Sequence, residues 1–325
     1  MWAQEMERIL GVLDRQLDAL ETRLGSVIAS EDPLVQQVFE PIRQSSGKRI
    51  RPVLVFLAAA CFSDELEPAL TVATSAELVH TATLVHDDVV DNAELRRGRP
   101  TIHSRFGNKI AVLGGDVLFA RSFNMLVHIG DTRFLRRVLL MISGMGEGEI
   151  MQLLHAYNVG VTEEQYIERV KRKTALFFEA CCELGALAGG ATEQQTTALA
   201  RFGLNVGIAF QIYDDLLDFT GDEARVGKPV CSDLREGNLT MPVLHCIRHS
   251  SQAPSIVEAI GRRALDAERI DAVRAAVREA GSLEYAAATA RAFVERGLAA
   301  LREIPPSTAR DDLEELAHYV IQRSY

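Results

Sequence analysis

The chain has 325 residues, with 35 Lys and Arg against 45 Asp and Glu, which gives a formal net charge of −10 at pH 7. This acidic balance excludes non-specific nucleic-acid binding and electrostatic attachment to an anionic membrane, because both require a basic face. With 47% hydrophobic and 25% charged residues, the composition is that of a folded globular protein rather than a disordered one.

The five cysteines show no C-x-x-C spacing, which is typical of a reduced, cytoplasmic protein without disulfides or a thiolate zinc site. The first twenty residues mix charged and apolar residues at helical spacing, so no signal peptide is expected. The longest apolar run, residues 52–62, is about half of the roughly 20 residues that a membrane-spanning helix needs. We therefore expect a cytoplasmic protein without a transmembrane segment.

Leu and Ala recur at three- and four-residue steps along most of the chain, which is the period of helices. The clearest stretches are residues 69–90, 110–129, 174–187, 198–219 and 284–301. Gly and Pro separate about ten such helices, and no run shows the alternation that marks strands. Several helices are apolar around most of their circumference, as in the middle of a large bundle. The sequence therefore predicts one all-α domain over residues 1–325.

One acidic motif occurs twice, each time inside an apolar helix: DDVVD at residues 87–91 and DDLLD at residues 214–218. Positions i, i+1 and i+4 share one helix face, so each copy places three carboxylates on one wall. Such like charges repel unless a cation neutralises them, and all-oxygen ligands favour Mg²⁺ over Zn²⁺. Two such walls with Mg²⁺ between them form a receptor for a diphosphate. The predicted metal ligands are Asp87, Asp88, Asp91, Asp214, Asp215 and Asp218.

Basic stretches accompany both acidic motifs, where they could bind phosphate oxygens. These stretches are residues 47–52, 96–99, 171–174 and 227–229. His80 lies seven residues before Asp87, nearly two helical turns, and so shares the face of the carboxylates. The alternatives are that each basic stretch is solvated surface and that His80 is an ordinary core residue.

Together these residues resemble the trans-polyprenyl diphosphate synthases, over about residues 41–245. The matching stretches are residues 84–91 and 95–101 for the first motif with its paired arginines, residues 210–219 for the second motif, and residues 172–176 and 227–229. The last two are most similar to heptaprenyl diphosphate synthase component II and its octaprenyl relatives. Asn238 departs from the pattern, since relatives often carry a Lys there.

The resemblance implies a single large helical bundle of the isoprenoid synthase type, with a central cavity between the two aspartate-rich helices. It implies a long-chain trans-prenyltransferase that condenses isopentenyl diphosphate with an allylic primer such as farnesyl diphosphate, giving for example heptaprenyl or octaprenyl diphosphate. The implied catalytic residues are Asp87, Asp88, Asp91, Asp214, Asp215 and Lys173. Those implied for isopentenyl diphosphate are Lys48, Arg51, His80 and Arg97, and those for the allylic diphosphate are Arg96, Lys173, Thr174, Gln211 and Lys228.

The resemblance also bears on product length. In short-chain relatives, the positions four and five before the first Asp often carry a bulky aromatic residue that blocks the growing chain. Here Thr83 and Ala82 occupy those positions, so a long-chain product is expected. The alternative is that these small residues only allow close helix packing.

Several readings stay open from the sequence. A short-chain synthase and a terpene cyclase share the fold, and a non-catalytic helical subunit is a further class. Two E-x-x-H pairs, at residues 77–80 and 315–318, have the spacing of di-iron carboxylate bundles, but that reading gives the acidic motifs no role. The resemblance implies either a homodimer or a heterodimer with a small component, and either the quinone side chain or another polyprenoid as the end use.

Overall fold

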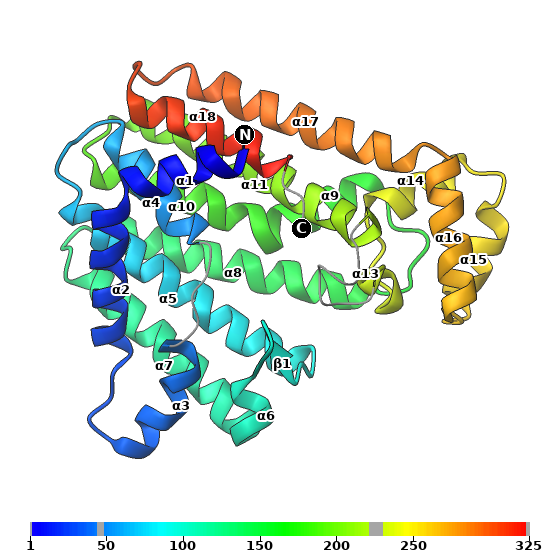
Figure 1. The fold of residues 1–325 in the computed structure, drawn as a ribbon, viewed down its shortest axis with the longest axis horizontal. Helices are drawn as coiled ribbons and strands as arrows, with labels where there is room; N and C mark the ends of the chain where they lie inside the picture. The colour runs from blue at the N-terminus through cyan, green and yellow to red at the C-terminus, as the bar shows by residue number, and fades with distance from the viewer. Residues whose placement is uncertain (1, 44–48, 221–229, 323–325) are drawn as a thin grey trace.

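The computed structural model describes residues 2–43, 49–220 and 230–322, and within them almost all regular structure is helical (Figure 1). The elements are α1 (Trp2–Val12), α2 (Asp14–Ile28), α3 (Pro33–Arg43), α4 (Ile50–Ala60), α5 (Glu67–Val90), β1 (Leu95–Arg96), β2 (Arg99–Pro100), α6 (Ile102–Phe106), α7 (Asn108–Val127), α8 (Thr132–His155), α9 (Glu163–Val170), a π-helical turn η1 (Lys171–Ala175), α10 (Leu176–Ala188), α11 (Glu193–Thr220), α13 (Ser232–Arg235), α14 (Met241–His249), α15 (Ala253–Gly261), α16 (Ala267–Glu279), α17 (Ser282–Leu301) and α18 (Thr308–Val320). The all-α prediction is confirmed.

The long helices α5, α8, α10 and α11 run side by side through the middle of the molecule (Figure 1). Helix α10 packs against α4 and α11, α5 packs against α7, and α17 packs on the outer side of α11. Helix α2 crosses one end of this bundle, and α14 to α16 cover the other. The N-terminal helix α1 packs against α18, which brings the two ends of the chain together.

One hydrophobic core runs through the bundle, from Ile9 in α1 to Val320 in α18. Helices α4, α10 and α11 contribute most of its large aromatic rings, including Phe56, Phe178 and Phe202, none of which is more than 1% exposed. Each of these helices packs against neighbours on several sides, which explains why its sequence is apolar around most of its circumference. A small second cluster, made of Val85, Ile102 and Ala111, lies apart from this core. The single domain stays a prediction.

Two features differ from what the periodicity suggests. Residues 95–96 and 99–100 pair as a two-residue antiparallel hairpin, too short to leave an alternating pattern. Helix α10 is preceded by the π-helical turn η1, so the predicted helix at 174–187 begins inside an irregular segment. Such π-helical turns are rare and occur mostly at functional sites.

The π-helical turn η1 lies between α8 and α11, and both helices approach it through glycine. A Cβ atom on Gly148 of α8 would lie 2.6 Å from the Lys173 nitrogen, and one on Gly207 of α11 would lie 2.7 Å from the Ala175 Cα. Because no real Cβ tolerates such distances, these two glycines allow the backbone of η1 to sit between the two helices. This packing fixes the position of the basic residues that η1 carries.

Helix α7 requires a correction to the expectation about apolar runs. At Asn108–Val127 it is long and apolar enough to cross a membrane by length and composition, although residues 52–62 looked like the longest candidate. It is the one such helix among the described residues, which is weak evidence because core helices often pass the same test. One side of α7 packs against α5, and the opposite side is exposed.

Candidate active site

The first acidic motif lies at the C-terminal end of α5. Burial, and after it the nearby carboxylate of Glu149, raise the pKa of Asp87 to about 6. Asp88 is 6% exposed, and burial raises its pKa although Arg96 Nε donates to its Oδ1 at 2.7 Å. Asp91 follows as the exposed C-cap residue of α5. The apolar helix thus holds carboxylates where their charge is costly.

The second motif lies near the C-terminal end of α11, and its carboxylates have different surroundings. Asp215 is 5% exposed and accepts hydrogen bonds from Tyr166 and Gln211, yet burial raises its pKa to about 6. Asp218 accepts from the backbone nitrogen and hydroxyl of Ser232, at 3.0 and 2.9 Å. The oxygens of Asp218 therefore anchor the start of α13.

A further acidic residue, Asp233 of α13, joins this group, and sequence reasoning gave it no role. Burial, and after it the charges of Asp215, Asp218, Glu236 and Asp214, raise the pKa of Asp233 to about 8. It stands in the stretch 233–238 that was compared with relatives because of Asn238. Asp233 stands 15 residues after Asp218, so no helical spacing links the two, although the Asp233 backbone nitrogen donates to Asp218 Oδ2 at 3.2 Å.

Both motifs face one cavity of about 200 Å³, called here the acidic cavity. It brings Asp91 of the first motif together with Asp215 of the second and with the basic turn η1. The residues that line it are Asp91, Gln152, Arg169, Val170, Lys173, Thr174, Gln211, Asp215, Ser232, Asp233, Glu236, Asn238 and Thr240. The predicted contacts of an allylic diphosphate, Lys173, Thr174 and Gln211, are therefore neighbours in space.

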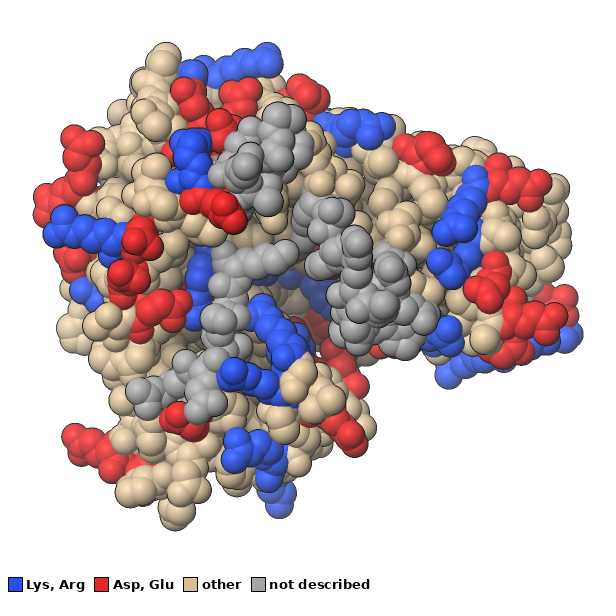
Figure 2. Space-filling model, viewed as in Figure 1, with Lys and Arg blue, Asp and Glu red and all other residues tan. Residues whose placement is uncertain are grey.

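A second cavity of about 440 Å³, called here the arginine cavity, lies between α2, α5 and the β-hairpin. His80 and Arg97, two of the residues predicted to bind isopentenyl diphosphate, line this cavity, and so do Arg96 and Arg99. Figure 2 shows Lys and Arg side chains gathered around a recess over the C-terminal end of α5 and the hairpin. Arg96 lines this second cavity rather than the acidic one. Lys48 and Lys228 lie outside the described residues.

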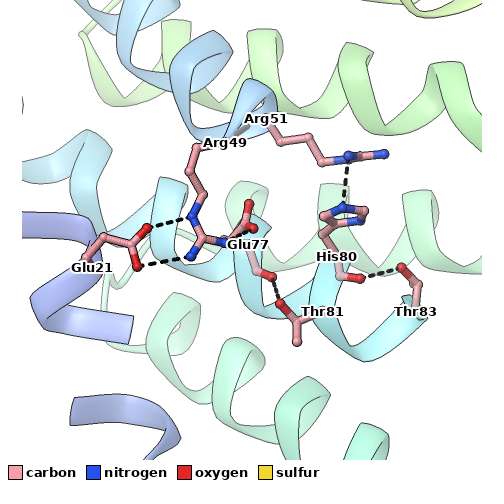
Figure 3. A network of polar contacts seen from close by, with 7 residues as sticks. All are labelled: Glu21, Arg49, Arg51, Glu77, His80, Thr81 and Thr83. Carbon is pink, nitrogen blue, oxygen red and sulfur yellow. Dashed lines mark hydrogen bonds and ion pairs between the residues drawn. The ribbon is translucent and has the colours of Figure 1, made fainter. Parts of the chain in front are cut away.

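Arg51 and His80 form a buried polar pair beside the arginine cavity (Figure 3). Arg51 Nη1 lies 3.2 Å from His80 Nε2, and its guanidinium stacks on the Phe177 ring at 4.7 Å. Burial, together with the positive charge of Arg51, holds the pKa of His80 well below its usual value, so the neutral ring accepts from Arg51. Arg51 Nε is buried without an acceptor among the described residues. An unused buried donor of this kind fits an anionic ligand.

Arg49 is a second residue that sequence reasoning missed. It adopts a left-handed conformation, with φ of 48°, at the start of α4. Its guanidinium pairs with Glu77 of α5, which is 5% exposed, and with Glu21 of α2 at 2.6 and 3.0 Å (Figure 3). Arg49 thus joins three elements around the arginine cavity. It stands in the basic stretch 47–52, but nothing local distinguishes it from its neighbours.

The two residues predicted to limit product length lie one turn before the first motif. Ala82 is fully buried, and Thr83 is half-buried with its hydroxyl donating to the His80 carbonyl at 2.8 Å (Figure 3). Neither lines the acidic or the arginine cavity as the described residues form them. Their role in chain length stays a prediction.

The di-iron reading finds no support in the described part of the chain. Glu77 pairs with Arg49, His80 contacts Arg51, and Glu315 pairs with Arg8 at 2.6 Å. No group of three His, Cys, Asp or Glu side chains is placed there to hold a metal ion unaided. Three of the four residues of the two E-x-x-H pairs are therefore engaged in other contacts.

An all-α bundle that points two acidic motifs and a basic turn into one cavity defines a helical transferase that handles diphosphates. The polyprenyl synthetase family model matches residues 32–277. The chain belongs to this family of prenyltransferases.

Individual relatives match over nearly their whole length. The chain is 39% identical to heptaprenyl diphosphate synthase component 2 of Geobacillus stearothermophilus, covering 99% of this chain and 100% of that one. It is 35% identical to octaprenyl diphosphate synthase of Escherichia coli, covering 98% and 99%. The crystal structure of a Caulobacter crescentus polyprenyl synthase, complexed with calcium and isoprenyl diphosphate, matches with a TM-score of 0.92 at 31% identity, covering 98% of both chains.

The raised carboxyl pKa values predict how the stability of the metal-free protein depends on pH. An Asp whose pKa is raised in the folded protein binds its proton more tightly there than in the unfolded chain. At pH values between its ordinary and its raised pKa, the folded state therefore carries more protons than the unfolded state. For Asp233 this window runs from 3.8 to about 8, so the free energy of unfolding should fall as pH rises through it. Asp233→Asn should flatten this dependence and be more stable than the wild type at the upper end. Denaturant unfolding with a chelator present measures both, and an unchanged slope would contradict the assignment.

Proposed function

We propose that the chain is a long-chain trans-prenyltransferase that condenses isopentenyl diphosphate with an allylic diphosphate such as farnesyl diphosphate. The observation that carries this is the pair of neighbouring anion-binding cavities. The acidic cavity joins Lys173 and Gln211 to the acidic motifs, and the arginine cavity holds Arg97 and His80. Two diphosphate substrates need two such sites.

We propose Mg²⁺ as the metal of the acidic cavity. The buried carboxylates fit a divalent cation, since burial and neighbouring carboxylates raise the pKa values of Asp87 and Asp233 and a bound cation would favour their ionised forms. Mg²⁺ takes only one or two protein carboxylates and completes its shell with water and phosphate oxygens, so it needs no ready-made cluster. Asp91 lines the acidic cavity, and Asp87 and Asp214 are the first carboxylates of the two motifs, so these three are the proposed holders of the metal.

In the proposed reaction, the carbon–oxygen bond of the allylic primer breaks and its diphosphate departs. Mg²⁺, when bound, offsets the charge that develops on that diphosphate. Lys173 and Gln211 donate to its oxygens from fixed positions, which favours the charged transition state. Arg51, His80 and Arg97 hold isopentenyl diphosphate so that its double bond attacks the allylic cation. A new carbon–carbon bond forms, and loss of a proton gives an allylic diphosphate one unit longer.

The direct test is incorporation of labelled isopentenyl diphosphate by the purified chain, with farnesyl diphosphate and Mg²⁺. We expect heptaprenyl- or octaprenyl-length products after dephosphorylation, and no product after chelation of the metal. Asp87→Ala and Asp214→Ala should each lower kcat by at least about a hundredfold. Their melting temperatures should hold or rise, because each change removes a crowded carboxylate. Near-full turnover by either variant would show that its carboxylate does not hold the metal.

Substitutions in the two cavities should weaken the binding of different substrates. Arg97→Ala should weaken mainly isopentenyl diphosphate, whereas Lys173→Ala should weaken mainly the allylic primer. Loss of one charge-assisted contact costs about 1.5–3 kcal/mol, or roughly ten- to a hundredfold in affinity. The KM values of both substrates for both variants provide the measurement. Equal effects on both substrates would overturn the division of roles.

Product length should respond to Thr83 and Ala82. A Phe ring at either position would occupy space that a growing prenyl chain needs, so Thr83→Phe and Ala82→Phe should stop at shorter products. Thr83 is the cleaner test because it is half-buried, whereas a ring at fully buried Ala82 should also cost about 1–3 kcal/mol through overpacking. Chromatography of the dephosphorylated prenols gives the chain lengths. Unchanged lengths in both variants would place the growing chain elsewhere.

We propose a homodimer that forms through α7 and α8. Most large hydrophobic side chains that are exposed in the described part of the chain lie on these helices, at Ile110, Val112, Leu113, Val117, Val127, Leu139, Leu140, Ile150, Leu153 and Leu154. An apolar surface of this extent marks an interaction site. A second copy presents the same surface, as a two-fold interface requires.

The measurement is sedimentation of the chain alone. The wild type should be a dimer and Leu140→Arg a monomer, while Val35→Arg, at an exposed apolar position on α3, should remain dimeric. A monomeric wild type would favour the alternative, a heterodimer with a small component.

A further inference from the structure

A chain of three hydrogen bonds, one buried and two partly buried, leads from α9 through α11 to the π-helical turn. Tyr166 Oη of α9 donates to Asp215 Oδ2 at 2.6 Å. Gln211 Nε2, one turn earlier on α11, donates to Asp215 Oδ1 at 2.7 Å. Thr174 Oγ1 of η1 then donates to Gln211 Oε1 at 2.8 Å. The Asp215 carboxylate is thus the terminal acceptor of the whole chain.

The direction of these bonds determines which groups can meet a ligand. An ionised carboxylate only accepts, so Asp215 orients the Gln211 amide with one N–H toward itself and Oε1 toward Thr174. The Thr174 hydroxyl gives its single proton to Oε1. The second N–H of Gln211, which lines the acidic cavity, is then the donor that this network presents to an anionic ligand.

Tyr166, which donates to Asp215, is itself held in a fixed position. Its side chain is fully buried, and the guanidinium of Arg169 lies over its ring at 5.4 Å while donating to the Leu239 carbonyl at 3.0 Å. Tyr166 thus donates to Oδ2 and Gln211 to Oδ1, so each oxygen of Asp215 accepts one hydrogen bond and the orientation of its carboxylate is fixed from two elements.

We propose that Tyr166 and Asp215 are positioning residues that orient Gln211 toward the allylic diphosphate. The proposal rests on the proposed function, since it concerns the same diphosphate site. The three carboxylates of the second motif then have different roles. Asp214 holds the metal, Asp218 anchors α13, and Asp215 acts through Gln211. Thr174 likewise acts through Gln211 rather than by donating to the diphosphate itself.

The test compares Tyr166→Phe, Asp215→Asn and Asp214→Asn by two binding measurements that need no turnover. The first is calorimetry with farnesyl thiodiphosphate, an unreactive allylic analogue, in the presence of Mg²⁺. The second is titration of Mn²⁺ into protein saturated with the analogue, followed by electron paramagnetic resonance. Tyr285→Phe is the matched control, because Tyr285 Oη also donates to a carboxylate, that of Glu163, at 2.8 Å and outside both cavities.

We expect Tyr166→Phe and Asp215→Asn to bind the analogue about tenfold more weakly, the loss of about one hydrogen bond, with unchanged Mn²⁺ affinity. Asp214→Asn should lose Mn²⁺ affinity, and Tyr285→Phe should change neither quantity. A loss of Mn²⁺ affinity in Asp215→Asn equal to that in Asp214→Asn would make Asp215 a metal ligand and overturn the proposal. If both Tyr166→Phe and Asp215→Asn bind the analogue as tightly as the wild type, the proposal is overturned as well.

Thermal unfolding of each variant checks that the fold survives, and Asp215→Asn keeps the test available if Tyr166→Phe does not fold. A separate measurement, product formation by the wild type, tests the proposed function. If the wild type forms no prenol from isopentenyl and farnesyl diphosphates, the reaction is wrong, whatever the binding measurements show.

Discussion

Buried negative charge between two apolar helices is the constraint on which the site depends. Helices α5 and α11 are apolar because they form the middle of the bundle, yet each ends in a group of carboxylates. Burial raises the pKa of Asp87 and Asp215 to about 6 and that of Asp233 to about 8, so the fold holds these groups at a cost. In the proposed function, a divalent cation bound by the carboxylates and a diphosphate bound by Lys173 would together offset that cost. The polar site thus sits where the surrounding core excludes water.

The bundle and the two acidic walls could be predicted from the sequence because both follow from the helical period. Asp87 and Asp91 share a helix face by spacing alone, and the apolar residues around them show that the face is enclosed. The same reasoning placed His80 correctly on the α5 wall. Local periodicity could not provide the partners that come from distant segments. Tyr166 reaches Asp215 across 49 residues, and Arg49 reaches Glu77 across 28.

The π-helical turn shows a second limit of local reasoning. Residues 171–175 are ordinary helix formers, and their sequence predicts a regular helix. The turn depends on the backbone approach of α8 and α11, which Gly148 and Gly207 permit from positions far along the chain. Only this packing sets Lys173 toward Glu149 at 2.7 Å and Thr174 toward Gln211. The sequence of residues 171–175 therefore identifies the candidate site residues. Tertiary contacts determine how their side chains are oriented and which of them donates a hydrogen bond.

Helix α7 connects the chemistry to the proposed assembly. Its inner side packs against α5, the helix that carries Ala82 and Thr83, and the hydroxyls of Ser75 and Ser122 meet between the two helices at 2.7 Å. Its outer side carries the exposed apolar surface. Beyond α5, a single helix thus separates this part of the bundle from solvent. A prenyl chain that grows along α5 needs apolar, water-free surroundings, and a second copy packed on α7 would stiffen and dry the wall that provides them. Chain growth and dimer formation would then depend on opposite faces of the same helix.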